Sequence, residues 1–400
     1  MQKTPQIYLF DIDGVLVEPR GYRRAVQAAF GYFANRMGLE ERLSPDEDDM
    51  AVFESWCITS EWDMVPLSLA ALFDTLLELN PGLPVPESLA ELSPLRPANL
   101  PARVNYRPYI ERIGSIVRPS EYPSEAVLRH AANSTPAIFP HLAGRPLLNA
   151  LCAHTRDIPH SLTTRIFQQF GLGSQAYTRA YGLPAQLQTP GLLEMYDRPL
   201  LAEGLRAALL ARQGRGELAL AAYTMRPSLP PRESIGLVLG YAPEAEIALA
   251  LVGLNELPLI GYGRISFLAE RHGSAPQVYL KPAPVQALAA ILAALSQNEI
   301  SALETARTVF YEPIGSHLSN WPVLQPSGCQ PVQIHIFEDS PGGIEAARKA
   351  GAILTQIGYP ARVQAWGIAS HPDKVAALQK IGAIVFATID TALRTAFQES

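Results

Sequence analysis

One short segment near the start of the chain, residues 7–16 (IYLFDIDGVL), constrains the fold and the chemistry more than any other. An apolar run typical of a buried strand ends at two carboxylates on alternate residues, Asp11 and Asp13, and Gly14 follows at once. Residues two apart in a strand face the same side, and open parallel sheets bind ligands at the carboxyl ends of their strands. The segment predicts a site there, although a strand followed by an acidic Asp-Gly turn would show the same pattern.

The spacing of the two carboxylates also indicates a kind of chemistry. Neighbouring carboxylates repel each other unless a cation or a shared proton relieves the repulsion. Asp11 and Asp13 therefore suggest a metal-assisted reaction in which one carboxylate attacks the substrate and the other handles a proton. A reaction of this kind needs further polar groups, and we expect them at neighbouring strand ends.

Length and composition narrow the class of protein. The 400 residues are enough for two domains or for one domain with a large insertion, and 48% are hydrophobic and 18% charged. The net charge is −6, whereas a nucleic-acid binder typically carries an excess of basic residues, so the composition does not suggest such a protein. We find no signal peptide and no apolar run of the roughly 20 residues that a membrane span needs. Cys57, Cys152 and Cys329 are far apart without a CxxC pair, which favours reduced thiols in a cytoplasmic protein.

The chain changes character near residue 196. Residues 21–37, 64–79, 124–133 and 161–170 have helical spacing, and prolines are dense from 84 to 140. Further along, strands are expected at 217–223, 277–280, 333–337 and 352–357, and helices at 198–213, 284–295 and 344–350. Alternating strands and helices predict an α/β fold with a doubly wound parallel sheet. We expect residues 1–17 and 196–400 to form this α/β core, and residues 18–195 to form a large, mainly helical domain inserted after the first strand.

Polar groups recur at four expected strand ends: Asp11 with Asp13, Thr224, Lys281, and Glu338 with Asp339. Phosphoryl transfer needs a nucleophile, a divalent cation and donors for the remaining charge. Asp11 would attack phosphorus, while Asp13 would protonate the leaving oxygen and then activate water. The expected Mg²⁺ ligands are carboxylates, Asp11, Asp13, Glu338 and Asp339, and the expected phosphate-binding groups are Thr224 and Lys281. Taken singly, Thr224 could cap a helix, Lys281 could be a surface charge, and the acidic pair could favour a helix dipole.

Four segments together resemble a known family. DIDGVL, YTMRP, YLKPAP and FEDSPGGIEAARKAG resemble, in order, the four motifs of the haloacid-dehalogenase-like (HAD) superfamily, over roughly residues 5–17 and 198–360. The fourth resembles the Glu-Asp-Ser variant, which does not rely on a later aspartate, and Gly343 stands where other members place one. The resemblance implies a Rossmann-like HAD core with a cap domain at 18–195, larger than usual for the family. The stretch from Lys281 to Glu338 is also longer than the family norm.

The resemblance implies a Mg²⁺-dependent phosphohydrolase that acts on a small phosphorylated metabolite through a phosphoaspartate at Asp11. Dehalogenases of the family resemble the pattern only with a non-acidic residue in place of Asp13, and phosphonatases use a cap lysine, whereas residues 18–195 contain no lysine. A phosphomutase of the β-phosphoglucomutase type would keep all four motifs and remains an alternative. A non-catalytic binding protein on the same fold is a second alternative.

Substrate recognition has one candidate residue. GYRRAV resembles the SYRxAI pattern of HAD proteins related to histidinol-phosphate phosphatases, so Arg23 is a candidate for binding a substrate anion. A surface arginine on an amphipathic helix would fit the same residues. Arg226 follows Thr224 closely and could brace the second-motif loop, and His335 inside a strand is expected to be structural.

Overall fold

The computed structural model describes residues 6–56, 58–118, 121–133, 137–236, 238–312 and 331–398. The chain divides into two compact units, one of Met1–Pro19 with Asp197–Ser400 and one of Arg20–Tyr196. The predicted domains were 1–17 with 196–400, and 18–195. Each unit is described by itself below.

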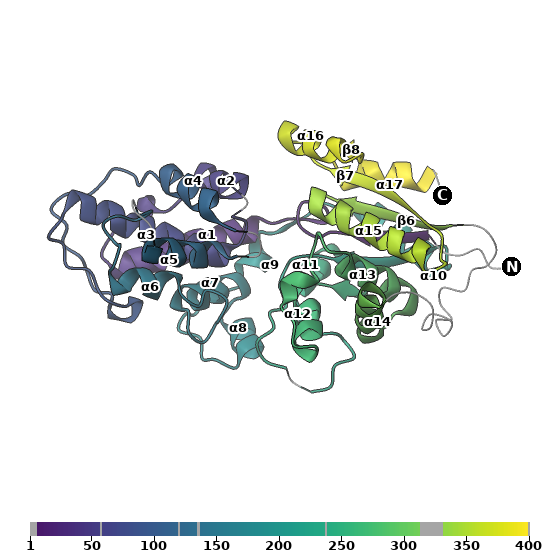
Figure 1. The fold of residues 1–400 in the computed structure, drawn as a ribbon, viewed down its shortest axis with the longest axis horizontal. Helices are drawn as coiled ribbons and strands as arrows, with labels where there is room; N and C mark the ends of the chain where they lie inside the picture. Colours follow the sequence, from purple (N-terminus) through teal and green to yellow (C-terminus); the bar gives the residue numbers. More distant parts are fainter. Residues whose placement is uncertain are drawn as a thin grey trace. The chain divides into compact units, whose positions relative to one another are not determined.

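The first unit is built on a six-stranded parallel sheet (Figure 1). Its strands are β1 (Gln6–Phe10), β4 (Leu218–Tyr223), β5 (Leu259–Ile260), β6 (Val332–Glu338), β7 (Ala361–Ile368) and β8 (Ile384–Phe386), in the order β5-β4-β1-β6-β7-β8. β1 pairs with β4 on one side and with β6 on the other. From β1 the chain first adds strands on one side and later on the other, so the order of the strands reverses between β1 and β6.

Helices cover both faces of this sheet, because successive side chains of a strand point to opposite faces. Ile7 and Leu9 of β1 pack with α12 (Tyr262–Arg271), α13 (Pro284–Ser296), α14 (Glu299–Tyr311), α15 (Pro341–Gln356) and α16 (Pro372–Lys380). Tyr8 and Phe10 pack with α10 (Glu203–Gly214), α11 (Glu244–Val252) and α17 (Ile389–Gln398). The predicted doubly wound α/β fold is confirmed.

Three expected elements differ from the structure. Residues 277–280 are not a strand: a 3-10 turn, η3 (Pro276–Val278), stands there, and Pro276 at its start has no backbone N–H to offer a strand ladder. Residues 352–357 are not a strand either, since α15 continues to Gln356 with Ala350 and Leu354 on its buried face. The strand β7 follows after Pro360. The helix expected from 198 begins at Glu203, and Arg198–Pro199 forms the short strand β3 instead.

The second unit is helical, as expected for the inserted segment. Its helices are α1 (Arg20–Arg36), α2 (Glu47–Ser55), α3 (Glu61–Leu79), α4 (Arg107–Ile116), α5 (Pro123–Asn133), α6 (Pro146–Cys152), α7 (Leu162–Leu172), α8 (Ser174–Tyr181) and α9 (Leu192–Tyr196). α3 is buried almost all round from Asp63 to Leu77, which makes it the central helix. α1, α6 and α7 pack against it.

Two further expectations concern the thiols and the membrane. Cys152 is a free, buried thiol at the end of α6, while Cys57 and Cys329 lie outside the described residues. Among the helices of the described ranges, none combines the length and the apolar character that crossing a membrane requires.

The central strands should carry more of the stability than the edge strand. Ile336 of β6 is fully buried, whereas Ile384 of the edge strand β8 is 47% exposed. We expect Ile336→Ala to lower the free energy of unfolding by about 2–5 kcal/mol, since it leaves a cavity in the core. The matched Ile384→Ala should change it by about 1 kcal/mol or less. Denaturant unfolding of both variants tests this, and equal losses would contradict the assigned sheet order.

Candidate active site

The predicted site residues meet at the switch point of the sheet. Asp11 follows β1, Thr224 follows β4, and Glu338 is the last residue of β6. These three strands are neighbours, and the backbone N–H of Asp11 donates to the carbonyl of Phe337 at 3.0 Å. Open α/β sheets bind their ligands at the carboxyl ends of strands where the strand order reverses.

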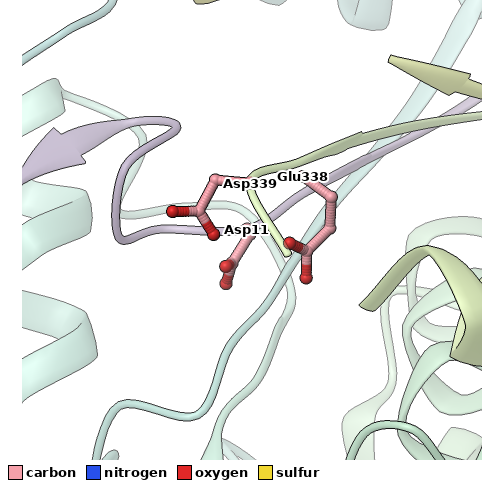
Figure 2. A group of neighbouring side chains, drawn as sticks. All are labelled: Asp11, Glu338 and Asp339. Atoms are coloured by element: carbon pink, nitrogen blue, oxygen red, sulfur yellow. The ribbon is translucent and has the colours of Figure 1, made fainter. Parts of the chain in front are cut away.

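Three carboxylates gather at this edge (Figure 2). Asp11, Glu338 and Asp339 each offer one oxygen, and the three oxygens lie within 4.8 Å of one another. Asp11 is 7% exposed and Glu338 is fully buried. Asp13, which the sequence also suggested as a metal ligand, is not in this group, because its side chain binds Arg226.

The ammonium of Lys281 lies between two of these carboxylates. Its Nζ is 3.1 Å from Asp11 Oδ1 and 2.7 Å from Glu338 Oε1, and it stands 3.9 Å from the centre of the Tyr223 ring. Burial lowers the pKa of Lys281, but the two carboxylates outweigh that effect and raise it overall, so the ammonium stays charged. Lys281 reaches the site from the turn after η3, although the sequence suggested a strand end.

Glu338 is held in one orientation. Its Oε2 accepts hydrogen bonds from the backbone N–H of Ser340 at 2.8 Å and from the Ser340 hydroxyl at 2.9 Å, while Oε1 faces Lys281. A Cβ on Gly343 would lie 1.6 Å from Glu338 Oε1. The lack of a side chain at Gly343 therefore leaves the space that Glu338 fills. This is the position at which, by the family resemblance, other members carry an aspartate.

Asp339 has two neighbours that the sequence analysis did not identify. Gly14 has φ +72°, and a Cβ there would lie 2.3 Å from Asp339 Oδ2. The same oxygen is paired with the ammonium of Lys374, on the first turn of α16. Lys374 was missed because we expected a strand at 352–357 and so overlooked β7, whose carboxyl end lies beside β6.

Crowding changes the proton affinity of the carboxylates. Burial raises the pKa of Asp11 to about 7, against the attraction of Lys281 and with further increases from Glu338 and Asp13. Burial likewise raises the pKa of Asp339 to about 6, opposed by Lys374 and assisted by Asp11. A divalent cation among these oxygens would favour their ionised forms.

Thr224 is buried at the end of β4. Its hydroxyl oxygen accepts from the backbone N–H of Arg226 at 3.2 Å, and its carbonyl accepts from Gln286 Nε2 at 2.8 Å. Gln286 also donates to the carbonyl of Ile260, so it ties the ends of β4 and β5 together. The hydroxyl shapes the turn after the strand rather than capping a helix, since α11 begins only at Glu244.

Arg226 is buried and binds the carboxylate of Asp13. Its Nε lies 2.8 and 3.0 Å from the two oxygens of Asp13, and its Nη2 lies 2.6 Å from Oδ1. The same Nη2 is 2.9 Å from Oδ2 of Asp197, which is also buried. Asp197 was not a candidate in the sequence, because no motif surrounds it.

Arg23 is the remaining candidate, on α1 in the helical unit. Its guanidinium lies 2.8 Å from Glu47 and 2.9 Å from Glu54, and its side chain is 39% exposed. An incoming anion would have to compete with these two carboxylates. Binding of a substrate anion by Arg23 therefore stays a prediction, and the structure shows it as an ion-paired residue of a helix surface.

His335 agrees with its expected structural role. Its Nδ1 accepts a hydrogen bond from the Trp366 indole at 3.0 Å, and burial lowers the pKa of His335 to about 4. The imidazole is therefore neutral at physiological pH.

Comparison with solved structures agrees with the fold. Over 98% of this chain and 98% of the other, the structure is similar to the X-ray structure of a Northeast Structural Genomics Consortium target, with a TM-score of 0.63 and 15% identity. Phosphatase Tt82 from Thermococcus thioreducens (TM-score 0.45, 14% identity, 99% and 100% coverage) also matches. A third match is a Thermotoga maritima protein described provisionally as a beta-phosphoglucomutase. Its TM-score is 0.39 and its identity 15%, over 98% of this chain and 99% of the other.

No family model and no curated protein matches the chain. At identities of 14–15% the structural likeness bears on the fold alone. The fold and the site define an α/β protein with a carboxylate and lysine cluster at the switch point of a doubly wound sheet. The likeness agrees with the doubly wound α/β fold that the four motifs implied.

Two adjacent glycines of α15 provide a matched test of the Glu338 pocket. Gly343→Ala should displace the Glu338 carboxylate from Lys281, because its Cβ would overlap Oε1. Gly342→Ala should be tolerated, because its Cβ would meet nothing nearer than Pro282 at 4.0 Å, and alanine favours helix by about 1 kcal/mol over glycine. Thermal unfolding and Mg²⁺ titration of both variants check this. Equal behaviour would mean that Glu338 does not occupy this position.

The raised pKa of Asp11 predicts a pH-dependent stability of the metal-free protein. Between the ordinary value of 3.8 and about 7 the folded state binds more protons than the unfolded state, so the free energy of unfolding falls as pH rises. Asp11→Asn should stabilise the metal-free protein at pH 7 and flatten this slope.

Thermal unfolding in EDTA from pH 4 to 7.5 measures the effect. Asp373→Asn, at a carboxylate that is 96% exposed, is the control and should keep the wild-type slope because Asp11 remains. An Asp11→Asn variant that is less stable than wild type at pH 7 without metal would refute the assigned charge crowding.

Proposed function

We propose that the protein is a Mg²⁺-dependent, HAD-like phosphohydrolase that acts on a small phosphorylated metabolite. The observation that carries the proposal is the buried ammonium of Lys281 shared between Asp11 and Glu338, at the switch point of the sheet. It supports the proposal because a nucleophilic carboxylate and a phosphate-binding cation must stand side by side for phosphoryl transfer.

The chain's residues suit the two halves of such a reaction. Asp11 would attack phosphorus while Asp13 gives a proton to the leaving oxygen, which releases the alcohol and leaves an aspartyl phosphate. Asp13 would then take a proton from water as the water attacks phosphorus, which restores Asp11 and releases phosphate. Lys281 and Thr224, with backbone N–H groups after Asp11, would hold the phosphoryl oxygens.

The acidic cluster fits a hard divalent cation. Asp11 Oδ1 is buried, and the ammonium of Lys281 faces it at 3.1 Å. Asp11 and Asp339 are the better placed ligands, because both oxygens of Glu338 already accept hydrogen bonds. Mg²⁺ would supply charge compensation for the carboxylates and for the transferring phosphoryl group.

The other reactions of the family fit less well. A dehalogenase would carry a non-acidic residue in place of Asp13. A phosphonatase would need a lysine in the helical unit to form a Schiff base, and that unit contains none. A phosphomutase would use the same residues as a phosphatase and differs in how water is kept from the phosphoaspartate. The helical unit is proposed as the cap that determines which metabolite reaches Asp11.

Phosphate release from a panel of phosphorylated metabolites, with Mg²⁺ and with EDTA, tests the proposal. We expect release that requires Mg²⁺ and falls by about 10³-fold or more in Asp11→Asn, because the nucleophile is lost. The preferred compound would identify the substrate class.

Three other outcomes would redirect the proposal. Full Mg²⁺-dependent activity in Asp11→Asn would exclude the phosphoaspartate route. No release from any compound, combined with Mg²⁺-dependent binding of beryllium fluoride, would favour the phosphomutase. No binding of beryllium fluoride would favour a non-catalytic protein on this fold.

A further inference from the structure

The carboxylate of Asp13 is held by a fork of hydrogen bonds. Arg226 contacts both of its oxygens through Nε and one of them again through Nη2, at 2.6–3.0 Å. The Arg226 side chain is 1% exposed, whereas that of Asp13 is 34% exposed. The arginine is therefore fixed inside the protein and the carboxylate presents its remaining surface outward.

A second carboxylate fixes the arginine. Asp197 lies 2.9 Å from Nη2 of Arg226, and its side chain is fully buried. A buried guanidinium between two carboxylates keeps its charge and has little freedom to turn, because each contact constrains the same planar group. Asp197 thus restricts the orientation of Arg226, and through it the position of Asp13.

The three residues come from three parts of the chain that meet in the α/β unit. Asp13 precedes β2 (Val17–Glu18), and Asp197 directly precedes β3 (Arg198–Pro199), which pairs antiparallel with β2. These two short strands are the outgoing and the returning connection to the helical unit. Arg226 lies two residues beyond Thr224, in the loop after β4. The side chain of Arg226 therefore links the loop after β4 to Asp13, before the outgoing connection, and to Asp197, before the returning one.

We propose that Arg226 is a positioning residue that fixes Asp13 for proton transfer, with Asp197 as the second anchor of its guanidinium. This inference rests on the proposed function, in which Asp13 moves the proton of the leaving group. Loss of the fork leaves Asp13 chemically intact but free to adopt other orientations. The penalty then falls on substrates whose leaving oxygen needs a proton.

Leaving-group dependence separates positioning from a general structural role. An alkyl phosphate such as glycerol phosphate needs protonation of its leaving oxygen, whereas p-nitrophenyl phosphate releases a stabilised phenolate. kcat/KM reports the steps up to formation of the aspartyl phosphate. We expect Arg226→Lys, which keeps the charge and loses the fork, to lower kcat/KM by about 10²-fold for the alkyl ester and by about tenfold or less for the aryl ester.

A matched control is available in the same unit. Arg264 is 2% exposed and is paired with two glutamates, Glu246 and Glu299, outside the site. Arg264→Lys should lower thermal stability in the same way as Arg226→Lys and leave the ratio of alkyl to aryl kcat/KM unchanged. In an Asp13→Asn background, Arg226→Lys should have no further effect on that ratio, because both changes act on one group.

The outcomes distinguish the inference from the proposed function. If wild type hydrolyses both esters and Arg226→Lys keeps the wild-type ratio, Arg226 does not position Asp13. If wild type releases phosphate from neither ester and from no compound of the metabolite panel, the proposed function itself fails. Should Arg226→Lys not fold, Asp197→Asn decides: a fall in the ratio supports the inference, and an unchanged ratio overturns it.

Discussion

The site depends on one buried positive charge. Sheet pairing brings Asp11 and Glu338 to the same edge, where burial and mutual repulsion oppose their ionisation. The ammonium of Lys281 contacts both and offsets part of that repulsion, and the face of the Tyr223 ring lies against it. Without this ammonium, Glu338 would be a buried carboxylate held by Ser340 alone among the partners described.

Space is the second requirement of the cluster. Gly14 and Gly343 come from different elements, yet each leaves room for a carboxylate oxygen that a Cβ would displace. Gly14 also adopts a left-handed conformation that few other residues tolerate. The two glycines allow Asp339 and Glu338 to approach Asp11, so the cluster requires the lack of a side chain at both positions.

The two carboxylates of the first motif are separated by their partners. Asp11 faces Lys281 and the acidic cluster, whereas Asp13 faces Arg226 and stands in a loop, because β1 ends at Phe10. Different environments for two carboxylates in the same motif are the physical basis for giving them different roles. The guanidinium also links Asp13 to Asp197, where the chain returns from the helical unit.

Local sequence was sufficient for much of the fold and for most of the residues that meet at the candidate site. The strand before Asp11, the strand before Thr224, the strand that ends at Glu338 and the long helices of the inserted unit all follow from apolar periodicity. Periodicity failed at 277–280 and at 352–357, because short apolar runs fit either a turn, a helix or a strand. Lys281 was found in spite of this, since its motif does not depend on a strand.

The sequence by itself therefore determined the class of fold, the inserted helical segment and the residues of the four motifs. Only the tertiary structure decided which charges meet. Arg226 lies 213 positions from Asp13, and Lys374 lies 35 positions from Asp339. No local sequence pattern predicts such pairs, because they form only when the sheet places β4 beside β1 and β7 beside β6. Strand order is a property of the folded sheet, and it selects the partner of each carboxylate.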